Sequence, residues 1–421
     1  MRNPGDRVNI GQTRLFLAVC AFAFALILSF SGLWNTGNWA HYDQLTYHLP
    51  YVNLLIERGL NPFGQSLSAT TPGMHLLYAA LALASGEVPL QPQSWLIPVA
   101  SSTVAALTLA CLAVCYRSIS NAWVWAPVLI LPVLASQYFI LAGAYLVTEG
   151  LGYFFLSAFL MTSCSSSQRR PLMAALLLAG LVLTRQTYLP AAIIMLLALM
   201  IVTPAPHPAT RLRQALYSVI PALAFLPFLL FWKGPVPPEF AVHSSSGINL
   251  PAILQSIALL GLLAAPLFPA LLAACNRRRL SILLPATILA LLPMLFSATD
   301  FNTEAGRFGS LVWTLSAAAD KVTILPILIY TLYAAGAFVL AHALMSGIKT
   351  VQVAALGYIT YSVSLCFQVY AWQRYSEVFA LILISLFASA LLPDRPRREM
   401  IFFTCFFIIW FAATLAMRAL P

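Results

Sequence analysis

Two acidic residues of this chain stand where a carboxylate could act on a bound ligand. The first, Asp43, lies in the segment HYDQLTYHLP, beside aromatic residues and directly after an apolar run. At a membrane surface, lipid and aromatic neighbours partly desolvate a carboxylate, which raises its basicity and lets it accept a proton from a hydroxyl. A solvated acid at the end of a membrane helix is the alternative interpretation of Asp43.

The second acid, Glu149, stands in AYLVTEG at the start of another apolar run. An unpaired carboxylate within hydrocarbon is costly, so Glu149 must face either an arginine in an ion pair or a substrate. His48 follows Asp43 at a spacing close to one helical turn, and it could hydrogen-bond this carboxylate or a phosphate. Packing at the interface is the alternative role of His48.

Three arginines, Arg185, Arg307 and Arg374, are expected on the same side of the membrane as these acids. A guanidinium group donates two parallel hydrogen bonds to a phosphate and keeps its charge, which suits an anionic lipid head group. Arginines also extend to the membrane interface without a function, so both interpretations stay open.

Motifs of common soluble enzymes are absent from the sequence: it has no phosphate-binding glycine loop, zinc-type histidine spacing or nucleophile elbow. His75 and His243 are lone histidines, which are more often structural than ligands. No motif requires a cofactor. A divalent metal between Asp43 and Glu149 stays open, although two acids so far apart in the sequence support it weakly.

The composition is that of a membrane protein. Of the 421 residues, 61% are hydrophobic and 8% are charged, whereas roughly 25% are charged in soluble domains. A soluble fold and a disordered chain are therefore excluded. The net charge of +10 comes from short basic clusters between apolar runs, which indicate membrane topology rather than binding to nucleic acid.

Apolar runs predict an all-α polytopic membrane protein with about 13 transmembrane helices, in a single domain over residues 1–421. With a cytoplasmic N-terminus, most Lys and Arg residues fall inside and most acids fall outside, as the positive-inside rule requires. The expected spans are 14–32, 95–116, 121–141, 146–162, 171–184, 187–203, 215–232, 252–274, 280–297, 323–345, 351–371, 376–393 and 400–419.

The first external segment, 33–94, is longer than a connection requires. It contains an amphipathic stretch and the segment TTPGMHLLYAALALASG, which is too short to span. Both are expected to form helices that lie along the interface. Leu45, Leu49, Val52 and Ile56 are expected on the side that faces lipid or protein.

The order of several short motifs resembles the GT-C superfamily of glycosyltransferases, which use lipid-linked sugar donors. YDQLTYHLP, TTPGMHLLY, AYLVTEG, TRQTYLP, AVHSSSGINLP and the RY pair of WQRYSE are similar, in this order, to motifs of the eukaryotic dolichyl-phosphate-glucose-dependent alpha-1,2-glucosyltransferase family. The similarity covers roughly residues 40–376. Two segments depart from the family pattern: Gln44 stands where the family usually has Glu, and DFNTEAGRF, with Asp300 and Arg307, replaces a contiguous Asp-Asn-Arg-His-Tyr stretch.

The resemblance implies an inverting transfer of a sugar, expected to be glucose, from a polyprenyl-phosphate donor to a hydroxyl of a glycan or lipid-linked acceptor, without a required metal. Asp43 is the expected general base. A composition rich in Ala, Leu and Arg indicates a bacterial relative in the inner membrane with its site facing the periplasm. A lipid or sugar transporter or flippase, and an O-antigen ligase or polymerase, are the alternatives. The expected substrate-binding residues are His48, Thr70, Thr71, Glu149, Arg185, Gln186, His243, Arg307, Arg374 and Tyr375.

Overall fold

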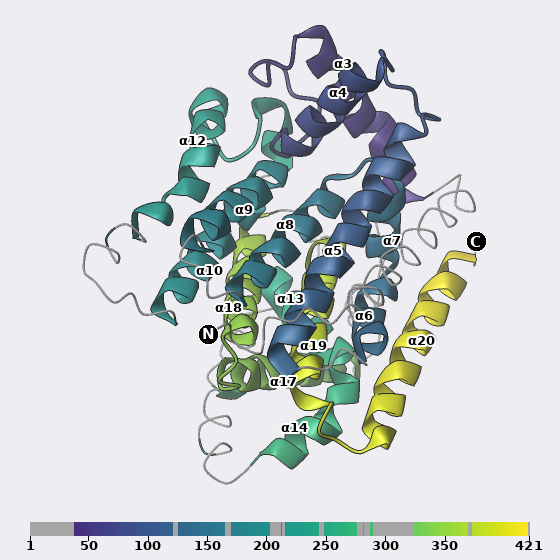
Figure 1. Ribbon diagram of the computed structural model, residues 1–421, viewed down its shortest axis with the longest axis vertical. Coiled ribbons are helices and arrows are strands. Elements are labelled where there is room, and N and C mark those ends of the chain that lie inside the picture. The colour runs from purple at the N-terminus through teal and green to yellow at the C-terminus, as the bar shows by residue number, and fades with distance from the viewer. Residues whose placement is uncertain are drawn as a thin grey trace, which may run out of the picture.

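A computed structural model places the protein as a bundle of helices elongated along one axis, and every secondary-structure element of its described residues is a helix (Figure 1). The all-α prediction is therefore confirmed for this part of the chain. The expected span 14–32, nearly all of 280–297, and Arg307 lie outside the described residues. The structure describes residues 38–120, 125–164, 170–202, 212, 215–243, 248–275, 281, 287–288, 324–368 and 373–419.

Short helices cover one end of the bundle and will be called the cap (Figure 1). Apolar side chains of α3, including Val52 and Leu55, are buried against Ala79 and Ala82 of α4. The apolar face of this segment thus packs on protein, although Leu45 stays exposed. The cap comprises α2 (Trp39–Asp43), the π-helical turn η2 (Gln44–His48), α3 (Leu49–Glu57) and α4 (Gly73–Ser85).

Beneath the cap, helices fill the long axis of the bundle, and α5, α6 (Ala126–Leu134), α13 (Leu250–Leu263) and α18 pack directly against α19. Of the 18-residue apolar window of α19, 89% is buried inside the protein, whereas the corresponding value for the span ending in α12 is 22%. α19 is therefore the central helix, and α12 lies at the periphery. The helices are α5 (Leu96–Ser120), α8 (Thr148–Ser163), α9 (Arg170–Thr184), α10 (Leu189–Ile201), α12 (Ile220–Trp232), α17 (Ile324–Leu344), α18 (Lys349–Ser364), α19 (Gln373–Leu391) and α20 (Arg397–Ala419).

Two of the expected spans, 121–141 and 252–274, are formed by bent helix pairs rather than by continuous helices. The first is α6 (Ala126–Leu134) followed by α7 (Gln137–Ala144), with a bend of 82° between them. Pro132 lacks a backbone donor, and Ser136 starts a new helix by accepting a hydrogen bond from the backbone N–H of Phe139. The second bends by 49° between α13 (Leu250–Leu263) and the pair η6 (Ala265–Leu267) and α14 (Phe268–Ala274).

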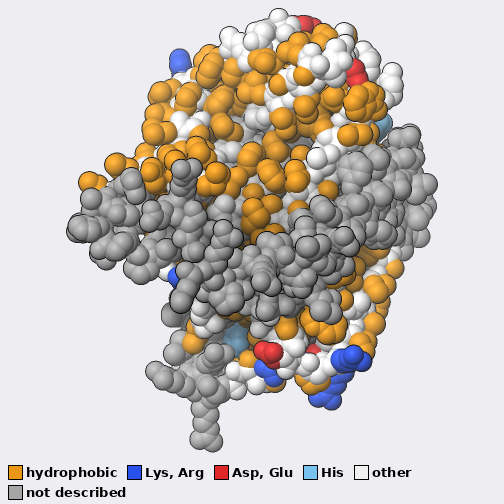
Figure 2. Space-filling model, viewed as in Figure 1, with side chains coloured by type: hydrophobic (Ala, Val, Ile, Leu, Met, Phe, Trp, Pro, Cys, Tyr) orange, Lys and Arg blue, Asp and Glu red, His pale blue; other side chains and the backbone are white. Residues whose placement is uncertain are grey.

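The length and apolar composition of several helices support a membrane-spanning protein. Within the described residues, five helices are long and apolar enough to cross a bilayer, or up to seven if each bent pair counts as one span. The expected number of about 13 is not confirmed, because several helices that coincide with predicted runs are shorter than the roughly 20 residues a span needs. Most charged side chains visible in Figure 2 gather at the two ends of the long axis, with hydrophobic side chains between them.

Candidate functional site

Four charged side chains from distant segments of the chain meet below the cap. Arg374, in the first turn of α19, donates from Nη1 to Oδ2 of Asp43 at 2.7 Å. Arg185, between α9 and the short helix η4 (Gln186–Tyr188), donates from Nη1 to Oε1 of Glu149 at 2.8 Å. A distance of 3.6 Å from Arg374 Nε to Glu149 Oε1 joins the two pairs. These four residues will be called the acid–arginine cluster.

Local structure explains how each side chain reaches the cluster. Glu149 lies in the first turn of α8, where the positive end of the helix dipole favours a carboxylate, and it also accepts a hydrogen bond from the Thr148 hydroxyl. The start of α19 is tied to α8 because the Tyr153 hydroxyl donates to the backbone carbonyl of Arg374 at 3.2 Å. In the cap, Gln44 Oε1 accepts from the backbone N–H of Leu146 at 2.9 Å. The cap and the start of α8 are thereby held together beside Asp43.

The cluster is largely removed from water. Asp43, Glu149 and Arg185 are 6%, 5% and 8% exposed, respectively. Bringing charges out of water is costly, and a buried charge is tolerated when an opposite charge and hydrogen bonds compensate it. Here two carboxylates face two guanidinium groups, so the cluster as a whole is formally neutral.

Aromatic rings form the walls around the guanidinium groups. The guanidinium carbon of Arg185 lies 3.8 Å from the centre of the Tyr375 ring, and that of Arg374 lies 4.3 Å from the centre of the Trp39 ring. Stacking on a ring face favours a planar cation and restricts its motion. Tyr375 was expected to bind substrate, and the structure places it in contact with Arg185. Trp39 is a site residue that the motif comparison missed.

His48 lies beside the cluster but has an unexpected partner. Its Nδ1 is 3.0 Å from Nε2 of His75, and no hydrogen bond joins it to Asp43 in the part of the chain that the structure describes. The pKa of His48 is lowered to about 4, chiefly by burial, and its imidazole is therefore neutral near pH 7. Of the two hydrogen-bond partners considered for His48, the Asp43 carboxylate is not bonded to it among the described residues, and contact with a phosphate stays a prediction. The lone-histidine interpretation of His75 missed this pair.

Three of the expected substrate-binding residues hold the loop before α4 in place. The backbone N–H of Thr71 donates to Gln186 Oε1 at 3.2 Å, while Gln186 Nε2 donates to the carbonyl of Ala69 at 2.7 Å. The Thr71 hydroxyl donates to the carbonyl of Val182, and that of Thr70 pairs with Ser68. These contacts orient the loop against α9, and direct binding of substrate by these residues stays a prediction.

Two expected residues cannot be located at the site. The backbone of His243 ends a 3-10 helix, η5 (Pro238–His243), but its side chain lies outside what the structure describes, as does all of Arg307.

Both carboxylates of the cluster are paired with arginines in the structure. Asp43 Oδ2 and Glu149 Oε1, two oxygens that could bind a cation, each accept a hydrogen bond from a guanidinium group. A cation there would be repelled by both arginines. Within the described residues, no group of three or more His, Cys, Asp or Glu side chains could hold a metal ion.

A scan against protein-family models and a search of the curated proteins find no match to this chain. The functional inference therefore depends on the geometry of the site and on the order of the short motifs.

Proposed function

We propose that this chain is a membrane glycosyltransferase that moves a sugar, with glucose favoured by the motif resemblance, from a polyprenyl-phosphate donor to a hydroxyl of a glycan or lipid-linked acceptor. The observation that carries the proposal is the acid–arginine cluster itself. Its members come from the cap, α8, the turn after α9, and α19, yet they form ion pairs of 2.7 and 2.8 Å. Four of the motifs that suggested the family, YDQLTYHLP, AYLVTEG, TRQTYLP and WQRYSE, supply the four members of the cluster.

The chemistry requires a base for the acceptor and positive charge for the leaving group. The acceptor oxygen attacks C1 of the sugar from the face opposite the phosphate, and Asp43 takes its proton. As the new C1–O bond forms, the bond between C1 and the phosphate oxygen breaks, and polyprenyl phosphate leaves with the electron pair. Guanidinium groups beside the site stabilise the negative charge that develops on that oxygen.

Arg374 links the two parts of this reaction. Its 2.7 Å ion pair occupies Oδ2 of Asp43, so that oxygen is engaged with a guanidinium group. A donor phosphate that draws Arg374 away from Asp43 would free this oxygen to accept a proton from the acceptor hydroxyl. We therefore expect donor binding to activate the base, while Glu149 keeps Arg185 in place through its 2.8 Å contact.

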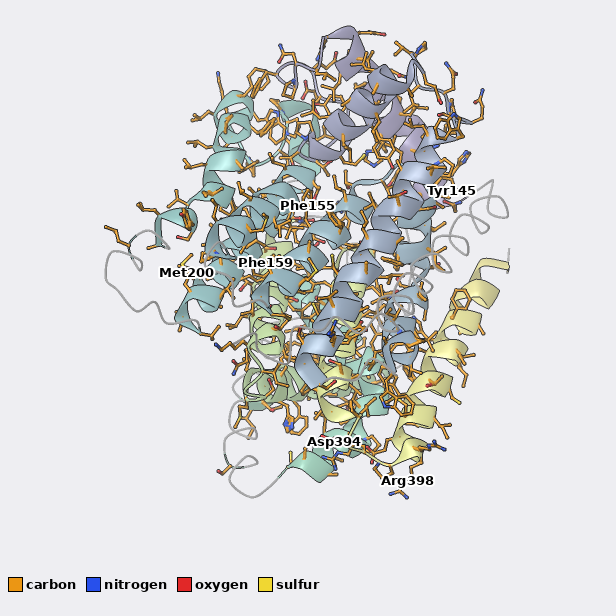
Figure 3. All side chains as sticks on the ribbon, viewed as in Figure 1. Tyr145, Phe155, Phe159, Met200, Asp394 and Arg398 are labelled. Atoms are coloured by element: carbon orange, nitrogen blue, oxygen red, sulfur yellow. The ribbon has the colours of Figure 1, made fainter. Side chains whose placement is uncertain are left out.

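The proposed location is a bacterial inner membrane with the cap on the periplasmic side. The connection from α19 to α20 with Asp394, and the first turn of α20 with Arg398, lie at the end of the bundle opposite the cap (Figure 3). Arg395 belongs to this connection, and Arg397 is the first residue of α20. Cytoplasmic placement of such a basic connection agrees with the positive-inside rule and leaves the cluster on the outer side.

The direct test uses purified protein in lipid vesicles with radiolabelled polyprenyl-phosphate glucose and total bacterial membrane lipids as acceptors. Asp43→Asn should reduce the label in new glycolipid by about 100-fold or more, the range of general-base catalysis, without loss of donor binding. Glu57→Gln, which changes an exposed acid of the cap, is the matched control and should transfer normally.

Three outcomes would contradict the proposal. Normal transfer by Asp43→Asn would exclude this carboxylate as the base. Label that crosses the vesicle membrane without entering a glycan would favour a transporter. Transfer from a diphosphate-linked donor alone would favour a ligase or polymerase.

A further inference from the structure

His75 is a buried titratable residue that the proposed reaction does not use. It lies on α4, is 0% exposed, and has its Nε2 3.0 Å from Nδ1 of His48. The Tyr51 ring packs on it with ring centres 4.7 Å apart. The other nitrogen of His75, Nδ1, is buried and has no hydrogen-bond partner among the described residues.

Both imidazoles of this pair are neutral near pH 7. Burial lowers the pKa of His48 to about 4 and that of His75 well below its usual 6.5. A neutral imidazole carries one N–H and one bare nitrogen. The contact between the two rings is therefore a hydrogen bond in which one ring donates and the other accepts.

The environment of His75 decides which ring donates. If His48 donated from Nδ1, the hydrogen of His75 would have to sit on its own Nδ1, as a buried N–H without an acceptor. Buried N–H groups without partners are rarer in proteins than acceptors that remain unused. His75 is therefore the donor through Nε2–H, its Nδ1 is the bare nitrogen, and the hydrogen of His48 is on Nε2.

The Nε2 atom of His48 is available to a ligand of the cluster. It has no hydrogen-bond partner among the described residues. The atom is also not fully buried, and His48 keeps 7% of its surface exposed. His48 ends the π-helical turn that directly follows Asp43, and the charges of all four cluster residues act on its ring.

We propose that His75 is a positioning residue that fixes His48 in the Nε2–H tautomer, so that His48 presents a hydrogen-bond donor to an oxygen of the bound ligand. Identifying that oxygen as one of the donor phosphate rests on the proposed function. The tautomer itself does not, because it follows from the two rings and their surroundings. His48 is then a hydrogen-bond donor rather than a second base.

The tautomer can be measured by nitrogen NMR of protein labelled with 15N-histidine in lipid, with the His48 signal assigned by its loss in His48→Asn. Wild type at pH 7 should show His48 protonated on Nε2 alone. His75→Gln, which retains an N–H donor, should preserve this tautomer, whereas His75→Leu should shift His48 toward Nδ1 protonation. His41→Gln is the control for a neighbouring histidine and should leave the His48 signal unchanged.

Binding of polyprenyl phosphate provides the second measurement. His75→Leu should weaken it about tenfold, the size of one lost hydrogen bond to a charged group, and His75→Gln should stay within about twofold. A His48 that is protonated on Nδ1 or doubly protonated at pH 7 would overturn the inference, as would an unchanged tautomer in His75→Leu. Normal transfer by Asp43→Asn together with the expected tautomer would instead contradict only the proposed function.

Discussion

The acid–arginine cluster and the contact between α13 and α17 are two buried regions built in opposite ways. In the first, four charged side chains from distant segments are held in ion pairs. In the second, Gly261 of α13 faces the backbone carbonyl of Leu332, and Gly336 of α17 faces that of Ile257, so the two backbones approach closely.

The difference separates residues needed for packing from residues needed for chemistry. Small residues at close helix contacts are the usual way in which membrane helices associate. Buried ion pairs contribute little net stability and are often replaceable by apolar side chains. A fold of this kind therefore does not need the acid–arginine cluster for assembly, which supports a binding or catalytic role.

The largest stability effect should come from breaking one ion pair of the cluster. Arg185→Gln leaves the Glu149 carboxylate buried without its 2.8 Å partner, which should lower the free energy of unfolding by about 3–5 kcal/mol. The double variant Glu149→Gln/Arg185→Gln should be more stable than Arg185→Gln alone, because no uncompensated charge remains. Denaturant titration in detergent followed by tryptophan fluorescence measures both. Equal stability of Arg185→Gln and wild type would mean that the pair is not buried.

The pH dependence of stability should reveal the buried histidines of the site. Because the pKa of His48 is about 4 in the folded protein and 6.5 when exposed, the unfolded chain binds the proton first as the pH falls. Stability is therefore complete above pH 6.5 and decreases toward pH 4, where the loss from His48 reaches about 3 kcal/mol.

The control for this dependence is His48→Asn, which should remove the His48 contribution and make the profile between pH 6.5 and 4 shallower, with the remaining slope coming from His75. Identical profiles for wild type and His48→Asn would contradict the burial of this ring. The groups that act on His48 or contact it are His75, Asp43, Glu149, Arg185 and Arg374.

A smaller effect, confined to stability, is expected at the glycine contact. A Cβ at position 336 would meet the backbone carbonyl of Ile257, so Gly336→Ala should cost about 1–3 kcal/mol of unfolding free energy, as overpacking does. Transfer per folded molecule should not change. Thr331→Ala, an exposed change on the same helix, should stay within about 0.5 kcal/mol of wild type. Loss of sugar transfer in folded Gly336→Ala would contradict the assignment of the glycine contact to packing alone.

Sequence reasoning located most helices and the four charged residues of the cluster, because apolar runs and rare charged residues can be recognised directly in the amino-acid sequence. It could not pair them: Asp43 and Arg374 are separated by 331 positions, and Glu149 could have faced either an arginine or a substrate. The pairing depends on how α8 and α19 pack, which no local pattern encodes.

Other differences had partial signals in the sequence. The break between α6 and α7 is marked by Pro132 and by the capping residue Ser136. Glu377, which was not considered as a site residue, is 1% exposed and accepts hydrogen bonds from Ser136 at 2.7 Å and Gln373 at 2.6 Å. A carboxylate a single helical turn from Arg374 could have indicated a second buried polar contact on α19.

The most direct test of the proposed site is a structure of the Asp43→Asn variant with polyprenyl-phosphate glucose bound. The phosphate should lie within hydrogen-bonding distance of the Arg374 or Arg185 guanidinium group, with the sugar carbon C1 facing position 43. A phosphate bound at the opposite end of the bundle, or a donor that leaves the acid–arginine cluster without contact, would contradict the proposed function.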